Sequence, residues 1–163
     1  MMLNFIEDPQ ANASWLEFGG FETLRSYGLS LPPAELKSYS KRRIQQMIAA
    51  YIPDDHLKFI KSLGYGFHTQ SATEQWVLAH AGFNPAKSLL NQPINDLIWG
   101  SNFTEHKEEA AQRLIFGHNI KKSIKTDEKW IGIDTGAYKT GQLSAARVTY
   151  DGRIEIISYR LDL

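Results

Sequence analysis

Residues 113–118 read RLIFGH, an apolar run that stops at Gly117 and His118. Two other stretches have the same form, WVLAH at 76–80 and WIGID at 130–134. A short apolar run that ends abruptly at a polar side chain is typical of a buried strand in a sheet. The three runs therefore predict the strands on which the fold is built.

The residues that follow predict an antiparallel pair of strands. Residues 143–150 and 153–159 flank the dipeptide Asp151-Gly152, which is a strong signal for a two-residue hairpin. The pair is expected to close the sheet region at one edge.

The first 64 residues have the pattern of helices. One helix is expected over 34–51, where four apolar residues recur at the spacing of a single helical face: Ile44, Met47, Ile48 and Tyr51. Prolines and glycines divide the rest into shorter helices at 1–6, 21–27 and 54–63. Helices followed by a hairpin-ended sheet indicate an α/β or α+β fold. We expect a single domain over 1–163, mainly helical over 1–64 and mainly strands over 65–163.

The composition excludes several classes of protein. The 163 residues include 18 acidic and 18 basic side chains and no cysteine. Without cysteine there is no disulfide scaffold, no thiolate zinc site and no cysteine nucleophile. A net charge of zero gives no general attraction to nucleic acid or to an acidic membrane, and no apolar run approaches the roughly 20 residues that cross a bilayer. Because MMLNFIEDP at the start carries acids where a secretory signal carries basic residues, we expect a cytoplasmic protein.

Two histidines are the candidate metal ligands. His80 and His118 each follow an expected strand beside a glycine-containing turn. Polar side chains at the ends of neighbouring strands meet in the crevice where α/β proteins bind ligands, and neutral imidazole binds zinc, manganese, iron or nickel. The alternative is a pair of unrelated loop histidines, because no HExxH motif is present. We interpret the other three as surface residues: His56, His68 and His106.

Two further patterns are less specific. Residues 40–43, SKRR, form the one basic cluster, and they are interpreted as an exposed helix face because acids follow at Asp54 and Asp55. Residues 132–136, GIDTG, resemble a turn whose backbone N–H groups could bind an anion. No second D-T-G is present to form an aspartic-protease pair.

The order of several segments resembles a known family. Along the chain these segments read SWLEFGGFETLRSYG, HAGFNP, DLIW, IFGHN and IGIDTGAYKTGQLSA. Together they resemble the C-terminal part of the calcineurin-like metallophosphoesterases, in the bacterial branch of serine/threonine protein phosphatases and diadenosine tetraphosphatase-like hydrolases. The resemblance runs from Met2 to about Val148. It is specific to the family and not to a substrate.

The resemblance implies a two-metal phosphoester hydrolase built on a ββ sandwich flanked by helices. His80 and His118 match the later metal ligands of the family, and Tyr138 matches a position that lines the phosphate pocket. The alternative for Tyr138 is a residue that stacks beside the sheet edge. The implied cofactors are two divalent ions, manganese first, with iron, zinc or nickel as alternatives. The implied substrate is a phosphoprotein or a dinucleoside polyphosphate.

Three motifs of the family are absent from the sequence: Asp-x-His, Gly-Asp-x-x-Asp-Arg and Gly-Asn-His-Glu. In the family they supply the first metal's ligands, the bridging aspartate, the general-acid histidine and a phosphate-binding arginine. In relatives, the stretch that resembles residues 1–9 directly follows Gly-Asn-His-Glu. We therefore expect a chain that begins inside the domain, lacks the N-terminal sheet strands and has little or no activity alone.

Three retained positions depart from the family's pattern. Ser101 stands where relatives place an arginine that contacts phosphate, Asn119 stands where threonine follows the second ligand, and Phe18 replaces an asparagine. Loss of the arginine removes a strong, directional phosphate contact.

Three hypotheses are left open by the sequence. The chain is a phosphatase part completed by a separate N-terminal half, a non-catalytic remnant that acts as an interaction module, or the product of a decaying gene. In each case, strands without their neighbours would expose a sheet edge and face, which favours self-association.

Overall fold

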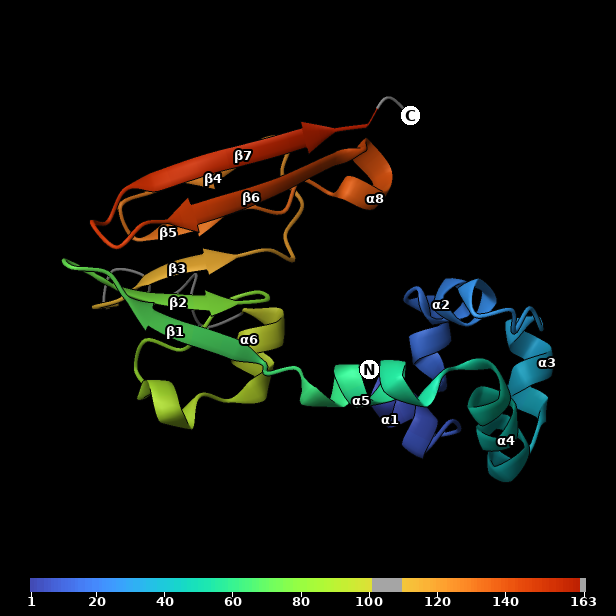
Figure 1. Ribbon diagram of the computed structural model, residues 1–163. Helices are drawn as coiled ribbons and strands as arrows, with labels where there is room; N and C mark the ends of the chain where they lie inside the picture. The colour runs from blue at the N-terminus through green and yellow to red at the C-terminus, as the bar shows by residue number, and fades with distance from the viewer. Residues whose placement is uncertain (101–109, 162–163) are drawn as a thin grey trace. The chain divides into compact units, whose positions relative to one another are not determined.

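The computed structural model describes residues 1–100 and 110–161 and divides the chain into two compact units, Met1–Leu63 and Gly64–Leu163 (Figure 1). The first unit contains helices, and the second contains a mixed sheet with short helices. The expected α/β class is therefore confirmed at this level. Within the described ranges, no helix is long and apolar enough to cross a membrane.

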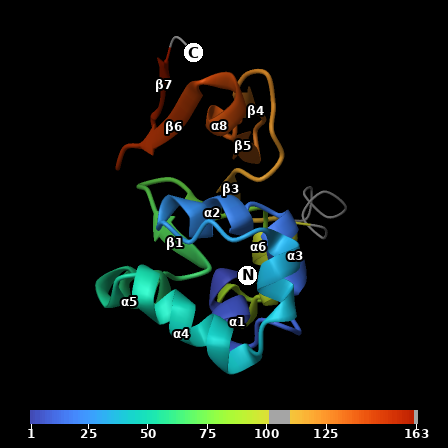
Figure 2. The same cartoon turned by 90° about the vertical axis from the view of Figure 1, so that its right-hand side faces the viewer.

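The first unit consists of short helices around one apolar core. They are α1 (Met2–Glu7), η1 (Ala13–Glu17), α2 (Gly20–Ser26), α3 (Pro33–Ser38), α4 (Lys41–Tyr51) and α5 (Asp54–Ser62). Helix α1 lies against α4, as Figure 2 also shows. The core combines one or two buried side chains from each of these helices except α5 with two residues from the connecting segments, Leu29 and Ile52. The residues from the helices are Phe5, Trp15, Leu16, Leu24, Leu36, Ile44 and Ile48.

The single helix expected over 34–51 is wrong. The structure has two helices there, α3 and α4, with a break at Tyr39 and Ser40. Ser40 has an extended backbone, and its Oγ accepts a hydrogen bond from the N–H of Arg43 at 3.3 Å. A serine in this position caps the start of a new helix, because it satisfies an N–H that has no partner within the helix.

The second unit is built on a sheet of five strands in the order β1-β2-β3-β5-β4. The strands are β1 (Gly66–Gln70), β2 (Gln75–Ala79), β3 (Arg113–Phe116), β4 (Lys125–Thr126) and β5 (Trp130–Gly132). Strands β2, β3 and β5 are parallel, and β1 and β4 pair antiparallel at the two edges. The three strands predicted from apolar runs are confirmed, whereas β1 and β4 were not expected.

A hairpin and short helices complete this unit. The predicted hairpin is confirmed as β6 (Gln142–Val148) paired with β7 (Ile154–Arg160). Its expected place at one edge of the sheet is wrong, because β6 and β7 form a two-stranded sheet of their own. The helices among the described residues of this unit are η2 (Leu89–Asn91), α6 (Ile94–Trp99) and α8 (Ala137–Thr140). Figure 1 shows the hairpin on one side of the sheet and α6 on the other.

Each side of the sheet has its own apolar core. Trp76, Ile115 and Ile131 pack against hairpin residues Ala146, Val148 and Ile154. On the opposite side, the buried residues are Val77, Phe83, Ala110 and Leu114, with Leu97 of α6 against them. The alternation of side chains along β2 and β3 thus fixes which residues face the hairpin and which face α6.

Candidate functional site

The parallel pairing of β2 and β3 brings two predicted residues together. His80 directly follows β2, and His118 lies two residues after β3. Ala79 and Phe116, the last residues of these strands, are partners in the sheet register. Because parallel strands end at the same edge of a sheet, both histidines lie at that edge.

The two imidazole rings are in direct contact. His80 Nε2 lies 3.1 Å from His118 Nδ1. The ring centroids are 4.9 Å apart, and the planes meet at 63°. This distance fits a hydrogen bond in which one nitrogen donates and the other accepts. It also fits two nitrogens bound to one metal ion, because zinc–nitrogen bonds of about 2.0–2.1 Å require the ligand nitrogens to lie within about 4 Å of each other.

The backbone at the end of β3 sets the position of His118. The N–H of Gly117 donates to the carbonyl oxygen of His80 at 2.8 Å, which extends the strand pairing by one residue. His118 then has a φ of +65°, and it is the one residue other than glycine with positive φ in the described ranges. Residues in this conformation collect at functional sites, because the surrounding structure must hold them there.

The C-terminal end of α6 places an aromatic ring beside the pair. Trp99 meets His118 edge to face, with 5.4 Å between ring centroids, and its side chain is 52% exposed. The N–H of Ala81 donates to the carbonyl oxygen of Leu97 at 2.9 Å, which ties α6 to the residue after His80. Gly100 has a φ of +69°, and a Cβ there would lie 2.4 Å from the carbonyl oxygen of Ala81. Glycine is therefore required for this approach.

A carboxylate completes the surroundings of the pair. Asp134 lies two residues after β5, and its Oδ1 accepts the N–H of Gly136 at 2.8 Å. Its carbonyl oxygen accepts the N–H of Lys121 at 2.9 Å, which joins the loop after His118 to the loop after β5. Burial holds the pKa of His80 below its ordinary value of 6.5, and the nearby His118 acts in the same direction. The Asp134 carboxylate opposes both by raising this pKa.

An open groove of about 550 Å³ lies next to His80. Its side-chain lining is mainly apolar and comes from the side of the sheet that the hairpin covers elsewhere: Tyr65, Phe67, Leu78, Ile115 and Ile133. A ligand held at the histidines would therefore have apolar surface on one flank.

The described residues supply two nitrogen ligands and no complete metal site. Across 1–100 and 110–161, no group of three or more histidine, cysteine, aspartate or glutamate side chains is arranged to hold a metal ion. The two imidazole nitrogens would supply two of the four ligands of a tetrahedral metal ion. An ion held firmly here would therefore need ligands in addition to His80 and His118.

The other predicted residues do not join the pair. Tyr138 lies in α8 with 85% of its side chain exposed, and in the described ranges no hydrogen bond or ring contact links it to either histidine. His56 contacts Tyr27, with 2.9 Å between Nδ1 and the hydroxyl oxygen, and His68 is exposed in β1. His106 and Ser101 lie outside the described residues.

Two residues beside the pair were not predicted as site residues: Asp134 and Trp99. Asp134 had a usable signal, because it follows the apolar run at 130–133 just as His80 follows its own run. No sequence signal pointed to Trp99, because its position depends on how α6 packs against Ala81.

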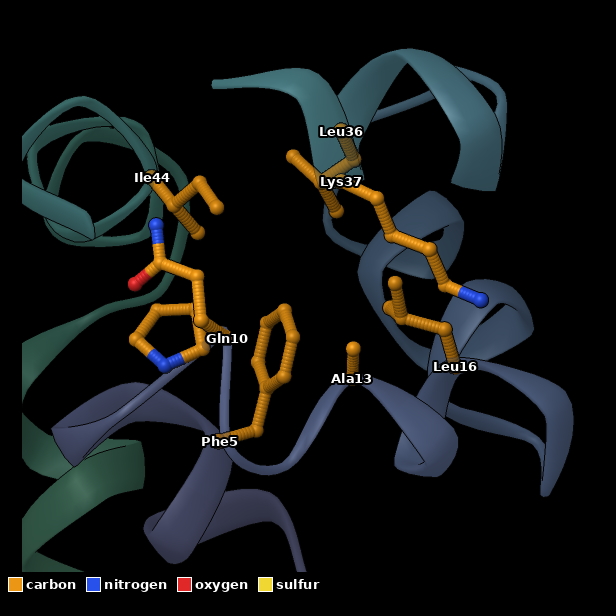
Figure 3. A pocket seen from close by; sticks show the side chains of 8 residues that line it. Phe5, Gln10, Ala13, Leu16, Leu36, Lys37 and Ile44 are labelled. Atoms are coloured by element: carbon orange, nitrogen blue, oxygen red, sulfur yellow. The ribbon is translucent and has the colours of Figure 1, made fainter. Parts of the chain in front are cut away.

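A second hollow, of about 190 Å³, lies in the helical unit (Figure 3). Figure 3 shows the Phe5 ring at the centre of its lining, with Lys37 along one side. Lys37 pairs with Glu17 at 2.8 Å, so its charge is already neutralised. The rest of the lining is mostly apolar, and the hollow offers no acid–base pair.

Comparison of the chain with protein-family models and with curated proteins finds no match.

Proposed function

We propose that His80 and His118 are two metal ligands of a calcineurin-like metallophosphoesterase, and that the chain takes part in the hydrolysis of phosphate esters. The observation that carries the proposal is the 3.1 Å between His80 Nε2 and His118 Nδ1. Parallel strand pairing places both histidines at one edge of the sheet, and with the positive φ of His118 the two rings are in direct contact. The order of the segments that resemble the family supports the same assignment.

The residues around the pair have matching roles in this proposal. The five-stranded sheet and the β6–β7 hairpin are the layers of the family's ββ sandwich. Divalent ions, with manganese as the first candidate, would bind phosphate and generate hydroxide as the nucleophile. His80 and His118 would hold one ion through the facing nitrogens. Histidine binds a metal as neutral imidazole, and the lowered pKa of His80 favours that form. Tyr138 would contact the phosphate, as its place in the IDTGAY segment implies.

The acidic ligands are the missing part of this site. Two metal ions held together require shared carboxylates, and the family motifs that carry them are absent from the 163 residues. We propose that a segment outside these 163 residues supplies them, and that the 163 residues alone are inactive. The substrate of the completed site would be a phosphoserine or phosphothreonine protein or a dinucleoside polyphosphate. A chain without cysteine needs no oxidising compartment, and we place this function in the cytoplasm.

Manganese titration by calorimetry tests the metal ligands. We expect weak binding of one ion, and we expect His80→Ala and His118→Ala each to weaken it at least about tenfold, because each removes one of two nitrogens. His56→Ala is the matched control, since it removes an exposed histidine from the other compact unit. Equal binding by all four proteins, or no binding by the folded wild type, would contradict the proposal.

Turnover of p-nitrophenyl phosphate tests the reaction. The chain with manganese should show no turnover above buffer. A fusion that places a family segment with the three missing motifs in front of residue 1 should show turnover that His118→Ala abolishes. A folded fusion that binds manganese and has no activity would reject the phosphoesterase assignment and leave the metal ligands in place.

A second function is favoured by the absence of a third ligand among the described residues. In this alternative the chain is a non-catalytic interaction module, and Nε2 and Nδ1 of the two histidines share a hydrogen bond. It predicts a folded protein that binds no divalent ion. The calorimetric titration therefore separates the two functions.

A further inference from the structure

Strand β1 presents a free edge of the five-stranded sheet. It pairs with β2 on one side, and within the described ranges no strand pairs with its other side. All five of its residues are exposed. The side chains of Phe67 in the strand and of Tyr65 just before it are 65% and 58% exposed. A row of unpaired backbone N–H and C=O groups at such an edge is a template for another strand.

The edge also lacks the charges that usually prevent pairing. Residues 63–73 read LGYGFHTQSAT and contain no lysine, arginine, aspartate or glutamate, in a chain that is 22% charged. Edge strands of monomeric proteins are usually kept apart by charged side chains, proline or a bulge. Gly66–Gln70 has no charge and no proline, and its five residues pair with β2 one to one.

The other edge strands of this unit carry charged side chains. Strand β4 has two residues, of which one is Lys125, and Asp127 and Glu128 follow it. The hairpin carries Arg147 and Glu155, which pair with each other at 3.1 Å, and β7 ends at Arg160. Among the described edge strands, β1 is thus the one without a charged side chain.

We propose that β1 binds β1 of a second copy of this chain, antiparallel and edge to edge, so that two five-stranded sheets join into one. A second copy fits because a two-fold axis places each residue opposite a fixed mate in its own strand, and an uncharged strand places no like charges together. The inference concerns the sheet edge and does not rest on the metal ligands.

The two-fold axis fixes the register of the pairing. With the axis at His68, the middle residue of β1, His68 faces His68 of the second copy. Phe67 then lies opposite Thr69, and Gly66 lies opposite Gln70. An aromatic residue opposite a β-branched residue is a favourable cross-strand pair, and here it occurs twice by symmetry. Phe67 is on the same side of the sheet as Leu78, its partner in β2, so the joined sheets would continue the apolar groove across the axis.

Residue 68 allows a direct test, because it is the position that meets itself. Sedimentation velocity over a range of concentrations should show the wild type in a monomer–dimer equilibrium. His68→Glu and His68→Lys should each weaken the dimer about tenfold, since like charges about 5 Å apart repel. An equimolar mixture of these two variants should restore the dimer, and added salt should weaken this mixed dimer.

Thr126→Glu is the matched control, because it places the same charge on β4 at the opposite edge of the sheet. It should leave the dimer unchanged. Circular dichroism confirms that each variant is folded. A wild type that stays monomeric, a dimer that survives both substitutions at residue 68, or a mixture that stays monomeric would each overturn the proposal. None of these outcomes depends on manganese binding, so failure here is distinct from failure of the proposed function.

Discussion

His118 has a left-handed backbone at the point where β3 ends, and this single conformation brings its ring to His80. A residue other than glycine adopts it at a cost of about 1 kcal/mol or more. The hydrogen bond from Gly117 to the carbonyl oxygen of His80 holds the preceding residue in line with β2. At this scale, the candidate site is two rings and the backbone that places them.

The effect of the Asp134 charge should be measurable in the pKa of His80. Burial lowers the pKa of His80 from 6.5, and Asp134 raises it, so Asp134→Asn should lower this pKa further. An NMR titration of the His80 ring protons gives the value directly. Asp55→Asn, an exposed carboxylate in the helical unit, is the control and should leave it unchanged. A pKa that is unchanged in Asp134→Asn would show that the carboxylate does not act on this ring.

Gly100 should be one of the least replaceable residues of the second unit. Gly100→Ala forces a positive φ on alanine and places a Cβ 2.4 Å from the carbonyl oxygen of Ala81, so α6 must shift. We expect the free energy of unfolding to fall by about 2–4 kcal/mol. Urea unfolding followed by Trp fluorescence measures the change.

Gly152→Ala separates backbone strain from crowding. Gly152 also has a positive φ, +83°, and a Cβ there would lie 3.0 Å from the hydroxyl of Thr73, at the end of a side chain that can move. It should destabilise the protein by about 1 kcal/mol. If both substitutions have the same effect, the close approach of α6 to Ala81 is not what requires glycine at 100.

At the scale of elements, Ser40 decides where one helix ends and the next begins. Its hydroxyl oxygen accepts the N–H of Arg43 at the start of α4. Ser40→Ala should lower the free energy of unfolding of the helical unit by about 1 kcal/mol, because that N–H loses its partner. Ser38→Ala is the control: Ser38 donates its hydroxyl to the carbonyl oxygen of Glu35 inside α3 and caps no helix. Equal losses for both, measured by thermal unfolding, would contradict the assigned cap.

The elements that could be predicted are those whose signals are local. Strands β2, β3 and β5 follow from apolar runs, and the hairpin follows from Asp151-Gly152. Strand β1 could not be predicted in this way, because GFHTQ has no alternation of apolar and polar residues and none of its side chains is buried. Its conformation depends on pairing with β2, which is a contact between segments. The break between α3 and α4 was missed because the apolar spacing in α4 outweighed a single serine.

For the candidate site too, the residues with a local signal could be predicted, and the contacts between segments could not. His80 and His118 could be selected because both follow strands, and parallel pairing brings strand ends together. Their separation could not be predicted, because it depends on the positive φ of His118 and on the packing of Trp99. Tyr138 was selected by resemblance, and nothing described in the structure ties it to the pair.

At the scale of the whole molecule, each unit has a core of its own. One apolar cluster lies within Met1–Leu63, and two lie within Gly64–Leu163, one on each side of the sheet. The candidate metal ligands, the groove and the β1 edge all belong to the second unit. The proposed metal binding and the proposed pairing of β1 therefore both concern the sheet of the second unit.

The most direct test of the central claim is a zinc titration followed by NMR of the histidine ring nitrogens, which identifies the nitrogen that binds. We expect His80 Nε2 and His118 Nδ1 to shift together along one binding curve that fits one zinc ion per chain, because they face each other at 3.1 Å. His56 and His68 should stay unchanged. Shifts at only one of the two histidines, shifts at the opposite ring nitrogens, or no shift at all would contradict the assignment of this pair as metal ligands.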